Sequence, residues 1–226
     1  MNKLITVAID GPAGAGKSTI AKIIGEKFNL MYINTGSMYR AVTLKALENN
    51  ISAEEVDKLL VMIDGMDMHF ENDELILNGE NINSLITMPN ISKNVSAYAS
   101  IREVRERLVN LMRKMALKYS VIMDGRDIGT VVLKDANFKF FLTASPEERA
   151  DRRYKELMGK GVEVNYDEIL QDIIKRDYLD SNREVDPLRK AEDAIEIDTT
   201  GIGIMGVVEK ISSYMEKYYG KKRNFS

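Results

Sequence analysis

A glycine-rich segment near the start of the chain restricts the possible folds more than any other part of the sequence. The run Gly11–Ser18 matches the pattern G-x-x-x-x-G-K-S/T at every fixed position. Glycines let the backbone curl so that several N–H groups point at one phosphate, and the helix that follows adds its positive end. Such a loop joins a buried strand to a helix, so the segment predicts an α/β fold that binds a nucleoside triphosphate.

The residues on both sides of this loop supply the expected context. Ile5–Ile9 is a short, β-branched apolar run that ends at a turn, which is typical of a buried strand. From Lys17 to Phe28 the apolar residues recur with helical spacing. Lys17 is the residue type that reaches the β- and γ-phosphates, and Ser18 is a type that ligates Mg²⁺ directly. The residues predicted to bind the triphosphate are Gly11, Pro12, Ala13, Gly14, Ala15, Gly16, Lys17, Ser18 and Thr19.

Strands and helices alternate along most of the remaining chain, and a capping box at Ser52–Glu55 sets the start of one helix. Further strands are expected at 31–34, 121–123, 138–142 and 194–197, and helices at 38–47, 52–63, 101–118, 166–182 and 204–219, with one more opened by Ser145 and Pro146. This alternation predicts a parallel five-stranded sheet flanked by helices. Residues of about 64–100 differ, with strands at 66–70 and 75–78, and we interpret them as an insert within a single domain that spans 1–226.

The composition excludes several classes of site. With no cysteine and with His69 as the single histidine, the chain cannot build a disulfide framework, a thiolate metal site or a multi-histidine metal site. A net charge of −3 gives no global attraction to nucleic acid, and neither a signal peptide nor an apolar run of about 20 residues is visible. We expect a cytoplasmic monomer that acts on small molecules and binds neither nucleic acid nor a membrane.

The phosphate loop alone does not fix the reaction, because switches, motors and kinases share it. A guanine-reading N-K-x-D segment is absent, and the strand at 121–123 is followed by Asp124–Asp127 instead of the Asp-Glu pair of mechanical ATPases. Asp124 stands at a strand end beside the loop. We predict that it holds Mg²⁺ through water, with a turn-capping aspartate as the alternative interpretation.

Arginines are frequent in the second half of the chain, and phosphoryl transfer depends on such cations to neutralise charge. Arg126 is the strongest candidate because it follows a buried strand at the carboxyl edge where ligands bind. Arg149, Arg152 and Arg153 share one helix face by their spacing, although a solvated face explains that spacing nearly as well. The other candidates are Arg40, Arg105, Arg176 and Arg183.

Several longer motifs resemble those of the bacterial cytidylate kinases, a family of nucleoside monophosphate kinases, and the likeness runs nearly from end to end. Thr35–Arg40 together with Asp124–Thr130 is the specific combination, which adenylate kinases do not carry. The further markers are Ile9–Pro12, Lys17–Thr19, Ser145–Ala150, Arg176–Asp177, Asp180–Arg183 and Asp198–Thr200. The resemblance implies ATP-dependent phosphorylation of CMP and dCMP to CDP and dCDP, with Mg²⁺ as the cofactor.

The resemblance also implies a role for each residue that matches a family motif. The residues implied for the acceptor's phosphate are Tyr39, Arg40 and Arg126, and those for cytosine are Ser96, Arg105 and Asp127. The residues implied for ribose and phosphates are Arg176, Asp180 and Arg183, and Thr35 joins the same CMP site. The implied catalytic set is Lys17, Arg126, Arg153 and Arg183. The insert of about 64–100 becomes an acceptor-binding subdomain, and about 149–183 becomes a lid over ATP.

Two alternatives stay open at this point. The first is a kinase of another nucleoside monophosphate, such as UMP or AMP. The second is a nucleotide-binding regulator that has no phosphoryl acceptor, against which the full set of arginines and the insert both argue.

Overall fold

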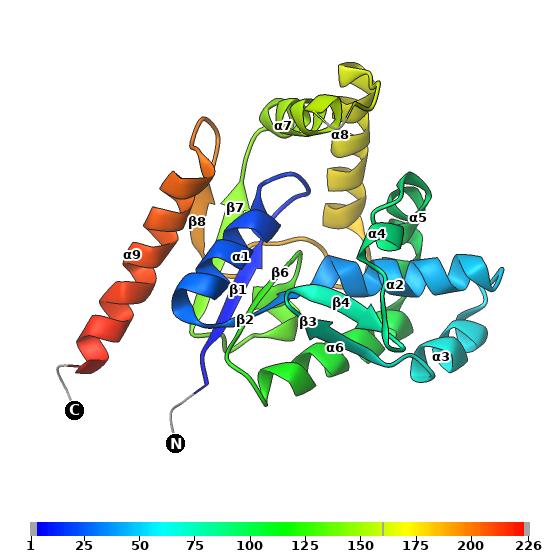
Figure 1. The fold of residues 1–226 in the computed structure, drawn as a ribbon, viewed down its shortest axis with the longest axis horizontal. Coiled ribbons are helices and arrows are strands. Elements are labelled where there is room, and N and C mark those ends of the chain that lie inside the picture. The colour runs from blue at the N-terminus through cyan, green and yellow to red at the C-terminus, as the bar shows by residue number, and fades with distance from the viewer. Residues whose placement is uncertain (1–3, 160, 224–226) are drawn as a thin grey trace.

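A five-stranded parallel sheet forms the centre of the computed structural model, which describes residues 4–159 and 161–223 (Figure 1). The strands are β1 (Thr6–Asp10), β2 (Met31–Asn34), β6 (Val121–Gly125), β7 (Phe138–Thr143) and β8 (Ile195–Asp198). They lie in the order β2-β6-β1-β7-β8, and every neighbouring pair is parallel. The predicted fold class is therefore confirmed, with the first strand of the chain at the middle of the sheet.

Alternating side chains of β1 pack into two hydrophobic layers, one on each face of the sheet. Val7 and Ile9 belong to the layer that also contains buried residues of α1 (Lys17–Phe28) and α9 (Ile204–Arg223). Ala8 points to the opposite layer, which is built with α2 (Thr35–Glu48) and α6 (Arg102–Ala116). Because successive side chains of a strand face opposite ways, β1 separates the phosphate-loop helix from the helices on the other face.

The remaining helices agree to different degrees with the helices predicted from the sequence. Further helices are α3 (Val56–Asp64), α7 (Pro146–Gly159) and α8 (Tyr166–Asn182). The predicted cap of α7 is present, because the Ser145 hydroxyl accepts from the Glu148 N–H at 3.1 Å. The start predicted for α3 is wrong by four residues. The Glu55 carboxylate does accept from the Ser52 N–H at 2.9 Å, but the backbone closes a separate turn there before the helix begins.

A second, smaller sheet lies between α3 and α6 in the chain. It contains β3 (Met68–Glu71), β4 (Glu74–Leu77) and β5 (Glu80–Asn81), all antiparallel, and it is followed by α4 (Asn83–Ile86) and α5 (Pro89–Ala99). A two-residue turn joins β3 to β4, with φ of 49° at Asn72 and 65° at Asp73, as tight hairpins require. The sequence predicted this hairpin but not β5, which has only two residues, both exposed.

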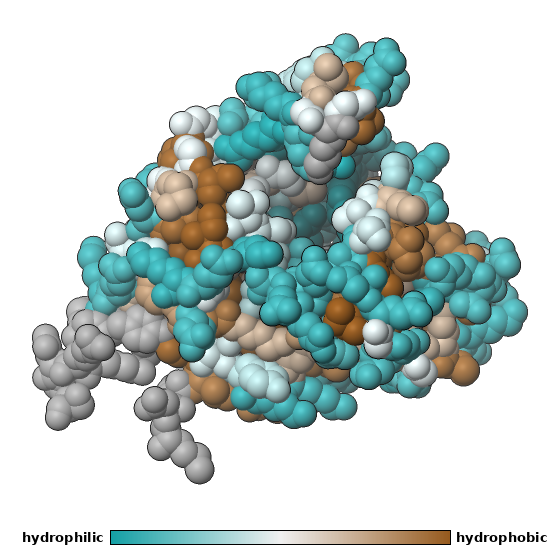
Figure 2. Space-filling model, in the orientation of Figure 1, coloured by the Kyte–Doolittle hydropathy of each residue, from teal (hydrophilic) through white to brown (hydrophobic). Residues whose placement is uncertain are grey.

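Helices α7 and α8 pack against each other and stand above the carboxyl edge of the large sheet (Figure 1). Figure 2 shows the surface hollowed between these two helices and the part of the molecule that holds α4 and α5. Within residues 4–159 and 161–223, no helix is both long enough and apolar enough to cross a membrane.

Candidate functional site

The phosphate loop connects the end of β1 to the first residue of α1 and lies against β7. Gly11 has a φ of 146°, and a Cβ built on it would lie 2.1 Å from the Leu142 carbonyl oxygen, so only glycine fits there. Helix α1 begins at Lys17 after Gly16, and no side chain caps its first N–H groups. These N–H groups and the positive end of the helix are suited to bind phosphate oxygens.

The Lys17 ammonium is held inside the loop. Its side chain is buried, and Nζ donates a 2.7 Å hydrogen bond to the Pro12 carbonyl oxygen across the curl. Burial lowers the pKa of Lys17 well below its usual value, and the positive charge of Arg126 lowers it further. A bound phosphate would place a negative charge beside this buried amine and so favour its charged form.

The predicted metal corner lies where α1 faces the end of β6. The Ser18 hydroxyl donates to Asp124 Oδ2 at 2.9 Å, and the Tyr32 hydroxyl donates to Oδ1 at 2.8 Å. Thr35 Oγ1 donates to the Asp124 carbonyl oxygen at 2.7 Å, which fixes the start of α2 at the same place. No group of three or more carboxylates or histidines able to hold a metal occurs in the part of the chain described. A cation held by Ser18 would therefore take its other ligands from phosphate and water.

Four charged residues form a closed ring of contacts, in which three are ion pairs and the fourth is a hydrogen bond to a backbone carbonyl oxygen. Arg105 pairs with Asp127 through Nη2, and its Nε lies 2.9 Å from Asp186 Oδ2. Arg183 pairs with the second Asp127 oxygen at 3.2 Å and donates from Nε to the Asp186 carbonyl oxygen at 2.7 Å. The Tyr39 ring lies 5.4 Å from Arg105 Cζ. The positive charges of two arginines cancel the negative charges of two aspartates, so the ring is suited to bind a polar but uncharged group.

Burial acts strongly on this ring. Burial raises the pKa of the Asp127 carboxyl, although Arg105 and Arg183 act in the opposite direction. Asp186 is the member that the sequence analysis missed. Its φ of 48° is in the left-handed region, and this turn lets both its carboxylate and its carbonyl oxygen face the ring.

A second cluster carries excess positive charge. Arg126 Nε lies 2.7 Å from Asp180 Oδ2, which is the cluster's carboxylate partner. Arg176 Nε is buried and has no hydrogen-bond partner among the described residues. Burial, with the charge of Arg126, lowers the pKa of Arg176 to about 10, and the same causes lower that of Arg40. Cations held so close together are stabilised by an anion between them.

Two predicted acceptor-site residues lie on the α4–α5 side. Arg40 donates from Nη1 to the Ile86 carbonyl oxygen at 3.0 Å and to Ser92 Oγ at 2.8 Å. These bonds join α2 to α4 and α5. Ser96 is half-buried on α5, three residues before Ala99, whose carbonyl oxygen accepts from Arg105 Nη1 at 3.1 Å.

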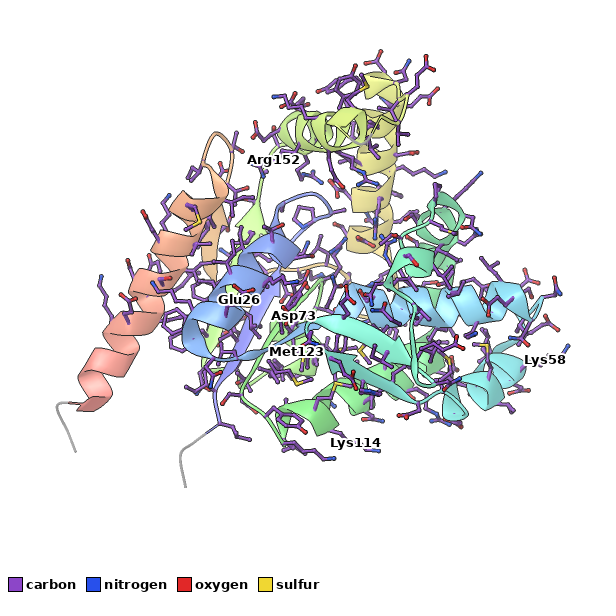
Figure 3. All side chains as sticks on the ribbon, viewed as in Figure 1. Glu26, Lys58, Asp73, Lys114, Met123 and Arg152 are labelled. Carbon is purple, nitrogen blue, oxygen red and sulfur yellow. The ribbon has the colours of Figure 1, made fainter. Side chains whose placement is uncertain are left out.

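The three arginines of α7 have three different environments, although their spacing predicts a shared face. Arg149 is buried, donates to the Ala13 carbonyl oxygen at 3.0 Å and pairs with both oxygens of Asp177 on α8. Arg152 points toward the end of β8, where it donates to the Thr199 carbonyl oxygen at 2.7 Å (Figure 3). Arg153 pairs with Glu156 at 2.8 Å on the surface.

Comparisons of the sequence with known proteins agree on one family. The sequence profile of the family described as cytidylate kinase matches residues 7–217. A cytidylate kinase of Clostridium perfringens (strain SM101 / Type A) is 99% identical over 96% of this chain and 100% of its own length. One of Clostridium acetobutylicum is 63% identical over 94% of this chain and 98% of its own. Among solved structures, an uncharacterized protein of Eubacterium ventriosum has the same fold. The TM-score is 0.54 at 16% identity, over 95% of this chain and 99% of the other.

Proposed function

The chain belongs to the cytidylate kinase family, and from that premise we propose how its residues transfer a phosphoryl group from ATP to CMP or dCMP, giving ADP with CDP or dCDP. The observation that carries the proposal is the separation of charge in the cleft. A cluster with excess arginine surrounds Arg126, and a balanced ring surrounds Asp127. A nucleoside monophosphate has the same two parts, an anionic phosphate and a neutral base.

The donor half is the phosphate loop. Loop N–H groups and Lys17 bind the β- and γ-phosphates of ATP, and phosphate binding restores the charge that burial disfavours on this lysine. Ser18 and Asp124 would hold Mg²⁺ directly and through water. The metal neutralises charge on the phosphate oxygens when it is bound.

The base pocket selects cytosine. The 4-amino group of cytosine donates hydrogen bonds, and the ring nitrogen and 2-carbonyl accept them. Asp127 and the Ser96 hydroxyl accept from the amino group, while Arg105 donates to the acceptors of the cytosine ring. Uracil has a carbonyl in place of the amino group, so it would put two acceptors face to face. A site built to bond one polar group discriminates strongly against a substrate that lacks it.

The acceptor phosphate binds in the cationic cluster. Arg40, Arg126 and Arg176 bind its oxygens, and Asp180 and Arg183 lie on the ribose side. Tyr39, whose ring lies against Arg105, is the further residue proposed for the phosphate. Because a phosphate oxygen is already ionised near neutral pH, transfer needs no strong general base. Arg126, Arg183 and Lys17 neutralise the moving group. Arg153 leaves Glu156 and joins them when α7 and α8 close over ATP and exclude water.

A substrate panel tests this proposal. We expect CMP and dCMP to be phosphorylated with kcat/KM at least about a hundredfold above UMP and AMP, because a mismatched buried hydrogen bond costs that much or more. Equal kcat/KM for CMP and UMP would contradict the base-pocket assignment. We also propose that the enzyme works as a monomer. Activity per chain that stays constant on dilution would support this.

A further inference from the structure

The buried aspartate at the end of β1 has no role in the reaction as described above. Asp10 is the last residue of the central strand, immediately before the phosphate loop, and it is 3% exposed. The alternation along β1 sends its side chain to the face of Ala8, away from α1 and toward the acceptor half of the cleft. Burying a carboxylate is costly unless hydrogen bonds satisfy it.

Two backbone N–H groups satisfy this carboxylate. Asp10 Oδ1 accepts from Ile128 at 2.8 Å, and Oδ2 accepts from Gly129 at 2.7 Å. These N–H groups belong to the first two residues of a short π-helical turn, η1 (Ile128–Val132). Helix starts leave N–H groups without partners, and here a side chain distant in the sequence provides both acceptors.

The residue just before this turn is Asp127, the residue that reads the base in the proposed function. Its carbonyl oxygen accepts from the Val131 N–H at 2.8 Å, so its backbone is part of the same turn. Gly129 fits tightly between Asp10 and Lys139, because a Cβ on it would lie 3.3 Å from Asp10 Oδ2 and 3.2 Å from Lys139 Cδ. The turn is thus held between β1 and β7.

We propose that Asp10 is a positioning residue. It holds the turn that carries Arg126 and Asp127 at a fixed place relative to the phosphate loop, so that donor and acceptor are aligned. The inference rests on the proposed role of Asp127. A carboxylate is required because it accepts at both oxygens, so the assays that test it are run at pH 8, where this group is ionised. An amide of the same shape would turn one donor toward an N–H group and lose that bond.

The test compares Asp10→Asn with Asp135→Asn, a matched control at an exposed aspartate just after the turn. We expect kcat/KM for CMP to fall about tenfold or more in Asp10→Asn, which corresponds to about 1.4 kcal/mol, mainly through a higher KM for CMP. The KM for ATP should change less than about twofold, and the preference for CMP over UMP should shrink. The control should match the wild type. Equal losses with CMP and UMP, or an equal rise in both KM values, would overturn the proposal.

Three further measurements test this inference, and the first two separate it from the proposed function. Asp127→Asn should itself reduce the preference for CMP over UMP, and adding Asp10→Asn to it should reduce that preference little further. If Asp127→Asn leaves the preference unchanged, the base-reading role fails. Amide hydrogen exchange at residues 128 and 129 tests the Asp10 contact independently of the substrate. We expect faster exchange at both in Asp10→Asn, and unchanged exchange would overturn the proposal. Gly129→Ala, which crowds the same contact from the other side, should reproduce the loss of preference.

Discussion

The Ser18 hydroxyl and the Asp124 carboxylate share a 2.9 Å hydrogen bond, which joins the start of α1 to the end of β6. Both side chains are candidates to hold the metal that accompanies ATP, and each already has the other as a partner. Tyr32 fixes the second carboxylate oxygen from β2. The corner is therefore oriented by three different elements of the fold.

Asp124→Asn should weaken the use of Mg²⁺. An amide keeps the shape but loses the charge and one acceptor, so the Mg²⁺ concentration for half-maximal activity should rise about tenfold or more. Activity at saturating ATP and CMP over a Mg²⁺ series measures this. Tyr32→Phe is the matched control, because it removes one bond to the same carboxylate away from the metal, and its shift should be much smaller. An unchanged Mg²⁺ series in Asp124→Asn would show that Asp124 only braces Ser18 and Tyr32.

Arg105→Met should destabilise the protein far more than Asp186→Asn. The first change leaves buried Asp127 without its main cation, which typically costs about 3–5 kcal/mol of unfolding free energy. The second removes one charge of a carboxylate that is 29% exposed, so the cost should stay below about 1 kcal/mol. Urea unfolding without nucleotide measures both. Similar losses in the two variants would contradict the central place of Arg105 in the ring.

Arg149→Lys should weaken ATP binding selectively. The guanidinium reaches the Ala13 carbonyl oxygen and both Asp177 oxygens together, and an ammonium cannot reproduce this planar arrangement. We expect the KM for ATP to rise about tenfold, with the KM for CMP nearly unchanged. Arg152→Lys is the control on the same helix, since its contacts lie at the end of β8. An equal rise of the KM for ATP and the KM for CMP would contradict this prediction, because the Arg149 contacts would then affect both substrate sites.

Asp10 should make stability depend on pH in an unusual direction. Burial raises its pKa from 3.8 to about 7, with the charge of Asp127 adding to the rise, although two N–H groups and Lys17 lower it. The folded state then binds a proton between about pH 4 and 7 that the unfolded state has released. The unfolding free energy of the wild type should therefore fall, relative to Asp10→Asn, as the pH rises through this window.

Each unit of the Asp10 shift corresponds to about 1.4 kcal/mol. Urea unfolding of both proteins at pH 5, 6, 7 and 8 measures the difference, which should level off above pH 7. A difference that grows with pH would mean that the N–H groups outweigh burial and lower the pKa.

The phosphate loop, α1 and β2 could be predicted from the sequence to within a residue, because their chemistry is local. Glycine spacing and the period of apolar residues each act over a few residues. The motif-based resemblance placed Arg105, Asp127 and Arg183 in one site, and the structure brings these three together.

Contacts between distant residues could not be predicted. Asp10 meets Ile128 across 118 positions, and Arg149 meets Ala13 across 136. Nothing near either residue in the sequence points to its partner. Asp186 was missed because its role depends on a left-handed backbone conformation. Aspartate tolerates this conformation, but no sequence motif indicates where it occurs. The spacing of the α7 arginines does place all three on one helix, but it could not predict that tertiary contacts give each a separate partner.

The central position of β1 has a consequence for how the protein is made. Thr6 pairs with Val121 and Val7 pairs with Phe138. More than a hundred further residues must therefore be synthesised after β1 before β6 or β7 can pair with it. At typical rates of synthesis the wait is on the order of ten seconds. Local contacts close sooner, so the β3–β4 hairpin forms while β1 is still unpaired. A chain that stops before β7 carries the phosphate-loop sequence but cannot assemble a nucleotide site.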